Sequence, residues 1–80
     1  MDTKTIGELV RKARKKQGLT QVEAAGYLNV GPRFLSDLEN GKPTVQLEKA
    51  IQVIESIGFK IFIVPKENQA LVRHIEDHPE

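Results

Sequence analysis

The chain has 80 residues, of which 39% are hydrophobic, and its formal net charge is only +1. This size predicts one small domain with a modest core, to which oligomerisation can add stability. There is no cysteine, which excludes disulfides, a thiol nucleophile and a zinc-finger ligand set. No apolar run approaches the roughly 18 residues of a membrane span, and the first residues, Met1-Asp2-Thr3-Lys4, lack the long apolar region of a signal peptide. We therefore expect a cytoplasmic protein.

The first expected element is an amphipathic helix over residues 5–17. Its apolar residues recur at helical spacing: Ile6, Leu9, Val10 and Ala13. We expect Thr3 or Thr5 to cap its start and Gly18 to end it. The other face is basic and carries Arg11, Lys12, Arg14, Lys15 and Lys16. Such a face is either simply solvated or a source of phosphate contacts on DNA.

Residues 19–41 contain two short helices separated by a tight turn. Thr20 and Glu23 form a capping box, which predicts a helix over residues 21–28. The sequence Asn29-Val30-Gly31 predicts a sharp turn, and Pro32 suits the first position of a second helix. That helix runs to about Asn40 and ends at Gly41. This layout is a helix-turn-helix, whose second helix enters the DNA major groove.

This stretch resembles the Cro/phage-repressor family, also called the XRE family, over about residues 6–58. The matching residues are Leu19-Thr20-Gln21, Ala25, Leu28, Val30, Ser36 and Leu38-Glu39-Asn40-Gly41. The resemblance implies a mainly α fold, a repressor-like DNA-binding domain of four to five helices. It also implies an ion pair between Arg14 and Glu39 that joins two helices, although two separate surface charges remain an alternative. The sequence departs from the family at Ala24, Gly26 and Gly31, where relatives commonly carry larger or hydroxyl side chains.

The candidate DNA-binding residues lie on and around the second helix of this unit. Arg33 is the first candidate for base readout, because arginine donates two hydrogen bonds to guanine, and a phosphate contact is its alternative. For Gln21 the resemblance implies a phosphate or base-edge contact, and for Lys42 we expect a charge contact with the backbone. The remaining candidates are Gly31 through its backbone N–H, Pro32, Phe34, Ser36 and Asp37. For Phe34, core packing is an equally good interpretation.

Beyond residue 41, the sequence predicts one more helix and then a strand. Thr44 is expected to cap a fourth helix that ends at Gly58, with Leu47, Ala50, Ile51, Ile54 and Ile57 on one face. Residues 59–65 are rich in β-branched and aromatic side chains and end at Pro65, which predicts a strand. A lone strand leaves its backbone groups unpaired, so we expect it to pair with the same strand of a second copy through Phe59, Ile61, Phe62, Ile63 and Val64. The alternative is an apolar arm that packs on its own domain.

A repressor-type domain followed by one such strand resembles HipB-type antitoxins. The resemblance implies a nucleoid-associated homodimer that represses its own operon at a palindromic operator and binds a HipA-like kinase toxin. Residues 66–80 form a tail in which a short helix over about residues 67–75 is possible. No cofactor is expected.

Three other interpretations stay open. The first is an enzyme. His74 and His78 stand four residues apart near Asp77, but two ligands in an acidic tail without a third make a weak metal site. The chain also has no nucleophile–base arrangement and no Gly-rich phosphate-binding loop. A stand-alone repressor without a toxin is the second interpretation. A protein-interaction module that no longer reads DNA is the third, and such a module lacks salt-sensitive DNA binding.

Overall fold

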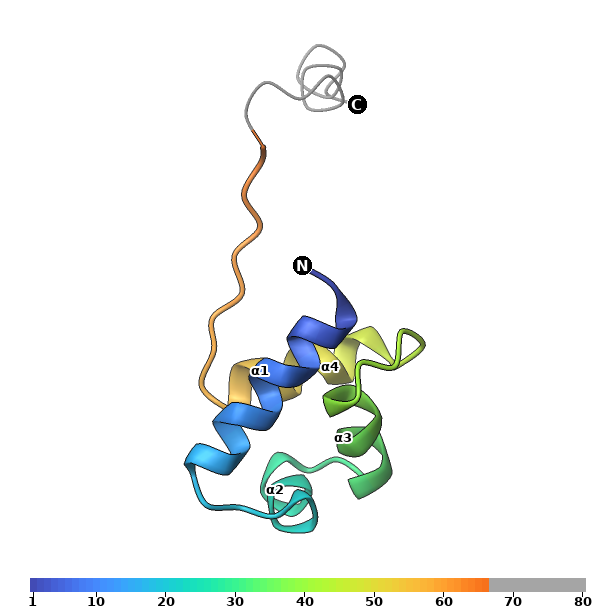
Figure 1. The fold of residues 1–80 in the computed structure, drawn as a ribbon, viewed down its shortest axis with the longest axis vertical. Coiled ribbons are helices and arrows are strands. Elements are labelled where there is room, and N and C mark those ends of the chain that lie inside the picture. Colours follow the sequence, from blue (N-terminus) through green and yellow to red (C-terminus); the bar gives the residue numbers. More distant parts are fainter. Residues whose placement is uncertain (67–80) are drawn as a thin grey trace.

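The computed structural model describes residues 1–66, and the expected tail helix and the metal interpretation at His74, Asp77 and His78 lie outside them. Within residues 1–66 the chain forms four helices (Figure 1): α1 Thr3–Lys16, α2 Gln21–Leu28, α3 Pro32–Glu39 and α4 Leu47–Ser56. None of the helices in this range is long and apolar enough to cross a membrane.

Helix α1 begins two residues earlier than its apolar spacing predicts, at Thr3. Asp2 is the N-cap, and its carboxylate accepts a hydrogen bond from the Thr5 backbone N–H at 2.8 Å. This hydrogen bond lowers the pKa of Asp2. The expectation that Thr3 or Thr5 caps the helix was therefore wrong. The Thr3 hydroxyl instead donates to the Gly41 carbonyl at 2.8 Å, which ties the start of α1 to the loop after α3.

The unit formed by α2 and α3 has the expected local chemistry. Thr20 and Glu23 make a complete capping box, with the Thr20 hydroxyl accepting from the Glu23 N–H at 3.1 Å and the Glu23 carboxylate accepting from the Thr20 N–H at 2.9 Å. Asn29 ends α2 with φ at 58°, in the left-handed region. Pro32 then occupies the first turn of α3. The turn is therefore fixed by residues within it.

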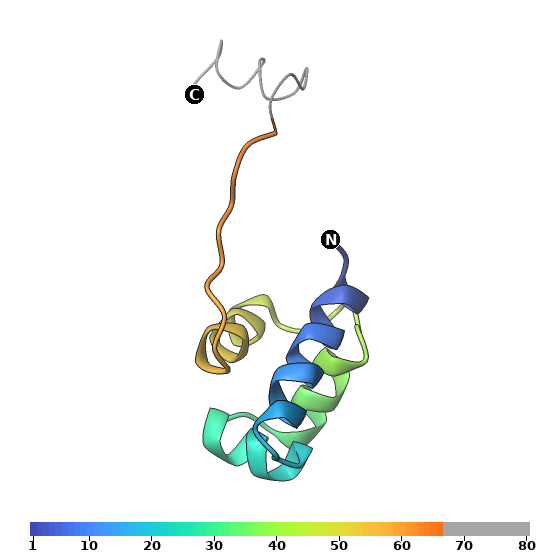
Figure 2. The same cartoon turned by 60° about the vertical axis from the view of Figure 1, so that its left-hand side comes forward.

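Helix α1 packs against α3 at a very close approach, and Figure 2 shows the two helices side by side. Gly7 permits this approach, because a Cβ atom there would lie 2.5 Å from the carbonyl oxygens of both Leu38 and Glu39. The core beneath these helices is made of Val10, Ala24, Ala25, Leu35, Leu38, Ala50, Val53 and Ile57. The small residues Ala24 and Ala25 are both buried to 1% exposure, so α2 also lies close to its neighbours.

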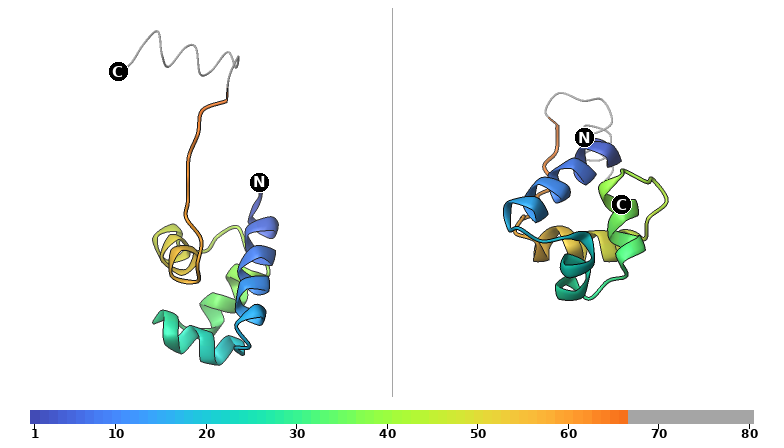
Figure 3. Two further views of the ribbon diagram at one scale, coloured as in Figure 1. Left: turned by 90° about the vertical axis from the view of Figure 1, so that its left-hand side faces the viewer. Right: turned by 60° about the horizontal axis from the view of Figure 1, so that its bottom comes forward.

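Helix α4 closes the core with Ala50 and Val53. In the left view of Figure 3, α4 is seen nearly end-on while α1 is seen from the side, so the two helices cross. The N-cap of α4 is Gln46, and it makes no side-chain capping bond. The expectation that Thr44 caps this helix was therefore wrong, because Gln46 occupies the N-cap position and Thr44 lies two residues before it.

After α4 the chain continues as an extended arm, residues 59–66 (orange in Figure 1), which contains no strand in the described structure. The expected strand is therefore absent from the single chain. The physical reason is that a strand requires hydrogen bonds to a neighbouring strand, and residues 1–66 offer none. Phe59 packs against the core, whereas Phe62, Ile63 and Val64 are 78%, 95% and 77% exposed.

Candidate nucleic-acid interface

Helix α3 has one buried side and one side that faces solvent near its start. Leu35 and Leu38 fix the buried side, with exposures of 0% and 4%. Pro32 and Arg33 are exposed, and Ser36 is half-buried on the next turn. The Arg33 side chain is 87% exposed. A rigid helix thus presents a guanidinium group at the N-terminal part of its open side, where a helix in a major groove contacts base edges.

Asp37 joins two basic side chains on this surface. Its Oδ1 lies 3.4 Å from Arg33 Nε, and its Oδ2 lies 3.5 Å from Lys42 Nζ. The backbone N–H of Lys42 also donates to the Asp37 carbonyl at 3.0 Å. The two cations therefore flank one carboxylate, one before it on α3 and one just after the helix.

The start of α3 has no side-chain cap. Gly31 is the N-cap residue, its φ is −70°, and it makes no capping hydrogen bond. Pro32 has no N–H, so the N–H groups of Gly31, Arg33 and Phe34 are the free donors of the first turn. Donors at a helix N-terminus suit a phosphate oxygen.

A buried carboxylate, Glu39, connects α3 to α1 and α2. Arg14 donates from Nε to Glu39 Oε2 at 2.7 Å and from Nη2 to Oε1 at 2.9 Å. Gln21 Nε2, at the start of α2, donates to Glu39 Oε1 at 3.0 Å, and Arg11 Nε lies 3.4 Å from the same oxygen. The Glu39 side chain has no exposed surface. The structure thus brings Arg14 and Glu39 together.

The protonation of this network follows from its contacts. Burial raises the pKa of Glu39, but the hydrogen bonds from Arg14, Gln21 and Arg11 and the charge of Arg14 outweigh burial and hold the pKa below its ordinary value of 4.5. The hydrogen bonds to Glu39 in turn raise the pKa of Arg14. The carboxylate and the guanidinium are therefore both charged at neutral pH.

Comparison with known proteins shows the family. A profile of the helix-turn-helix family, HTH_3, matches residues 10–62. The chain belongs to this helix-turn-helix family. It is 52% identical over 59 residues to an uncharacterised HTH-type transcriptional regulator, y4mF, of Sinorhizobium fredii, covering 74% of this chain and 78% of the relative. It is 30% identical over 63 residues to the ImmF control region 10 kDa protein of Bacillus phage phi105, covering 76% of this chain and 70% of that protein.

A more distant similarity reaches endothelial differentiation-related factor 1 of Rattus norvegicus, which is 27% identical over 59 residues. The aligned residues make up 74% of this chain and 40% of that protein. The helix-turn-helix match, together with the relatives, identifies a transcriptional regulator of the HTH type.

In this helix-turn-helix protein, the predicted DNA-binding residues do not all lie on one open surface. Pro32, Arg33, Asp37 and Lys42 lie on the open side and at the end of α3. Phe34 instead packs against the core, and Lys49 Nζ lies 5.9 Å from the centre of its ring. We therefore leave Phe34 out of the DNA-reading set.

Sequence reasoning missed the specific role of Arg11 in this helix-turn-helix protein. Besides its contact with Glu39, Arg11 donates from Nη2 to Asn40 Oδ1 at 2.7 Å. Asn40 Nδ2 lies 3.5 Å from Ser36 Oγ. Arg11 thus connects α1 to the end of α3. No local signal separates it from its basic neighbours, because the contact joins residues far apart in the sequence.

Proposed function

We propose that this protein is a sequence-specific DNA-binding repressor that acts as a homodimer on a palindromic operator. The observation that carries the proposal is the exposed Arg33 side chain near the start of α3, on a helix locked to α1 and α2 through Glu39. A base-reading residue has to be held in register, because a bidentate contact with guanine tolerates little displacement.

The residues around α3 provide donors for the DNA backbone. Lys42 follows the helix, and Gln21 stands at the start of α2. One N–H of the Gln21 side-chain amide is used by Glu39, and the second is able to donate to a phosphate. In this proposal, Gln21, Lys42, and the N–H groups at Gly31 and the first turn of α3 contact phosphates, while Arg33, with Ser36 beside it, reads bases. Phosphate contacts orient the protein, and base contacts select the sequence.

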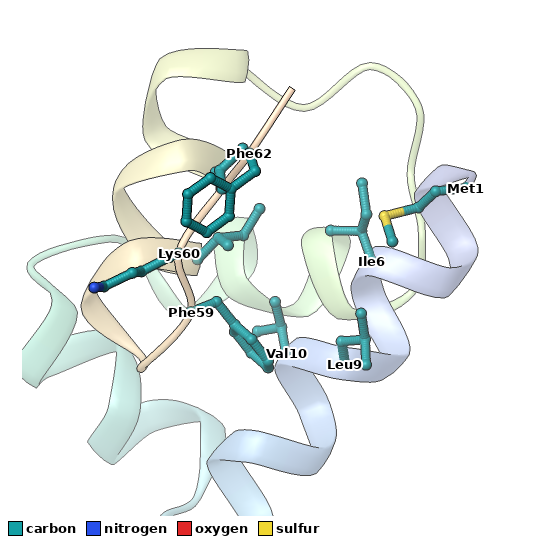
Figure 4. A pocket seen from close by; sticks show the side chains of 9 residues that line it. Met1, Ile6, Leu9, Val10, Phe59, Lys60 and Phe62 are labelled. Atoms are coloured by element: carbon teal, nitrogen blue, oxygen red, sulfur yellow. The ribbon is translucent and has the colours of Figure 1, made fainter. Parts of the chain in front are cut away.

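The homodimer part of the proposal is supported by the exposed apolar arm, residues 59–66. An apolar groove of about 240 Å³ lies between α1 and the arm, and Figure 4 shows Met1, Ile6 and Leu9 on one side of it and Phe59 and Phe62 on the other. Pairing of two arms about a two-fold axis would satisfy their backbone groups and cover these side chains. Such a dimer would present two α3 helices to half-sites roughly 34–36 Å apart.

A narrower proposal is that this repressor is the antitoxin partner of a HipA-like kinase toxin. Its support is the succession of a repressor-type domain and a short apolar segment, residues 59–65, which resembles HipB-type antitoxins. The test is the reading frame beside the gene, followed by co-purification of its product with this protein. A kinase-like neighbour that co-purifies supports the antitoxin role, whereas its absence favours the stand-alone repressor.

The experiment that tests the DNA-binding proposal is fluorescence anisotropy with the DNA upstream of the gene and with a scrambled duplex, over a series of salt concentrations. Selection from a library of random duplexes supplies the preferred site independently. We expect tighter binding to the native duplex and a steep loss of affinity with salt, since each neutralised phosphate releases counterions. Equal and weak binding to both duplexes contradicts the proposal and favours the protein-interaction module.

A further inference from the structure

We infer that Asp37 is a positioning residue that determines specificity: its carboxylate orients Arg33 toward a base and holds Lys42 back from indiscriminate phosphate contact. This inference rests on the proposed DNA-binding function. It assigns a role in sequence specificity to Asp37, an acidic residue that lies beside both Arg33 and Lys42 on the proposed DNA-binding surface. An acidic residue on a DNA-binding surface otherwise opposes binding, because it faces a chain of phosphates.

The geometry gives each cation its own carboxylate oxygen. Arg33 faces Oδ1 through Nε, at 3.4 Å, and Lys42 faces Oδ2 through Nζ, at 3.5 Å. A contact through Nε leaves the two terminal nitrogens of Arg33 free, and those nitrogens form a bidentate pair with O6 and N7 of guanine. The Asp37 side chain is only 25% exposed and is less exposed than the side chains of Arg33 and Lys42. Of these three side chains, it is therefore the one held most firmly in place.

Lys42 is held at two points. Its backbone N–H donates to the Asp37 carbonyl at 3.0 Å, and its ammonium group lies beside the Asp37 carboxylate. A lysine that contacts a phosphate has to give up or share this carboxylate. The cost applies on every DNA sequence, whereas the orienting effect on Arg33 is useful only where guanine is present. One carboxylate therefore weakens non-specific binding and preserves specific binding.

The contacts of Asp37 are too weak to serve mainly the stability of the fold. Exposed ion pairs contribute about 0–1 kcal/mol, and the order Arg33 before Asp37 along a helix is the less favourable one. The Arg33 side chain is 87% exposed and the Lys42 side chain 49% exposed. Removing the carboxylate charge should therefore leave the fold intact, so that any change is visible in DNA binding.

The test compares wild type, Asp37→Asn, Arg33→Ala and the double variant. Each is titrated with the selected duplex, with every single-base variant of one half-site and with a scrambled duplex, over a salt series. Glu55→Gln is the matched control, since it removes an exposed carboxylate on α4, outside the proposed surface. Thermal unfolding of all variants verifies that they are folded.

We expect Asp37→Asn to bind the scrambled duplex more tightly and to lose about fivefold to tenfold of its preference for the selected duplex, part of the discrimination that one arginine–guanine contact provides. The loss should concentrate at the base pair that Arg33→Ala also affects. In the Arg33→Ala background, Asp37→Asn should not change base preference further. Glu55→Gln should behave as wild type.

Two results overturn the inference. Base preference that survives Asp37→Asn shows that the carboxylate does not position Arg33. A loss of preference that persists in the Arg33→Ala background shows that Asp37 reads a base itself, for example by accepting from cytosine N4. Both leave the repressor proposal standing. Failure of the wild-type protein to discriminate between duplexes overturns the proposed function, and this inference with it.

Discussion

Arg14 and Glu39, which are 25 residues apart, meet through two parallel hydrogen bonds of 2.7 and 2.9 Å inside the core. Arg14 also donates from Nη1 to the Leu19 carbonyl at 2.8 Å. One guanidinium therefore holds α1, the loop before α2, and the end of α3. The planar, forked shape of arginine makes this arrangement possible, and lysine would not reproduce it.

Removing one member of this ion pair should strongly destabilise the protein. Glu39→Gln leaves the Arg14 charge buried without a counter-charge, which typically costs about 3–5 kcal/mol. Chemical denaturation at neutral pH, with the midpoint and slope both fitted, measures the change.

The control replaces both members at once. Arg14→Met with Glu39→Leu removes both buried charges and should recover most of the stability, because an apolar pair of similar volume often replaces a buried ion pair at little cost. Stability of the double variant equal to that of Glu39→Gln would show that the pair is not the cause of the loss.

The lowered pKa of the Glu39 carboxyl group predicts that the stability of the protein depends on pH. The pKa of Glu39 in the folded protein lies below its ordinary value of 4.5, so the unfolded chain binds the proton more tightly than the folded one. The stabilisation is therefore complete above about pH 4.5 and is lost as pH falls through the lower, folded pKa. Denaturation midpoints between pH 7 and pH 3 should fall more steeply for wild type than for the double variant, which has no carboxyl group at position 39.

Substitution by alanine should have opposite effects on stability at Gly7 and at Gly26. Gly7→Ala should destabilise by about 2 kcal/mol or more, because the new Cβ would clash with backbone carbonyls of α3 that cannot move separately. Gly26→Ala should stabilise by about 0.5–1 kcal/mol, because nothing lies within 4 Å of its Cβ position and alanine favours the helix. Thermal unfolding of both variants measures these changes in stability. Equal melting temperatures for the two variants would contradict the close approach of α1 to α3.

Arg33→Ala should lose discrimination at one base pair in each half-site while retaining much of its salt-dependent affinity. The reason is that a base contact distinguishes sequences, whereas phosphate contacts on other residues remain. Lys42→Ala is the comparison, and it should weaken binding on all sequences to a similar extent and flatten the salt slope. Anisotropy against a panel of single-base variants measures both. Unchanged preference in Arg33→Ala would remove Arg33 from the base-reading residues.

Ile61→Lys with Ile63→Lys should convert the proposed dimer to a monomer. The charges would lie in the apolar arm, where two copies are proposed to meet, and burying them without partners is costly. Val22→Lys with Tyr27→Lys is the matched control, since both side chains are exposed, at 68% and 81%, on α2. Sedimentation velocity distinguishes the species, and a dimer that persists in the arm variant rules out pairing through the arm.

The sequence by itself determined most of the helix-turn-helix unit, because its boundaries depend on neighbours in the chain. The capping box of Thr20 and Glu23 starts α2, the left-handed Asn29 ends it, and Pro32 starts α3. Each of these effects acts within one helical turn. The caps of α1 and α4 were predicted wrongly for the complementary reason: several polar residues near a helix start are able to cap it, and distant contacts choose among them. Thr3, for example, bonds to Gly41.

The tertiary structure alone decided how the surface of α3 is arranged. Apolar spacing placed Leu35 and Leu38 inward, but it did not reveal that Phe34 packs on the core under Lys49, or that Arg33 and Lys42 share Asp37. Nor does sequence spacing place Arg11 and Gln21 on the same carboxylate oxygen. Helix propensity and capping depend on adjacent residues, whereas the partners of a buried charge depend on which helices cross, and close packing at Gly7 determines that crossing.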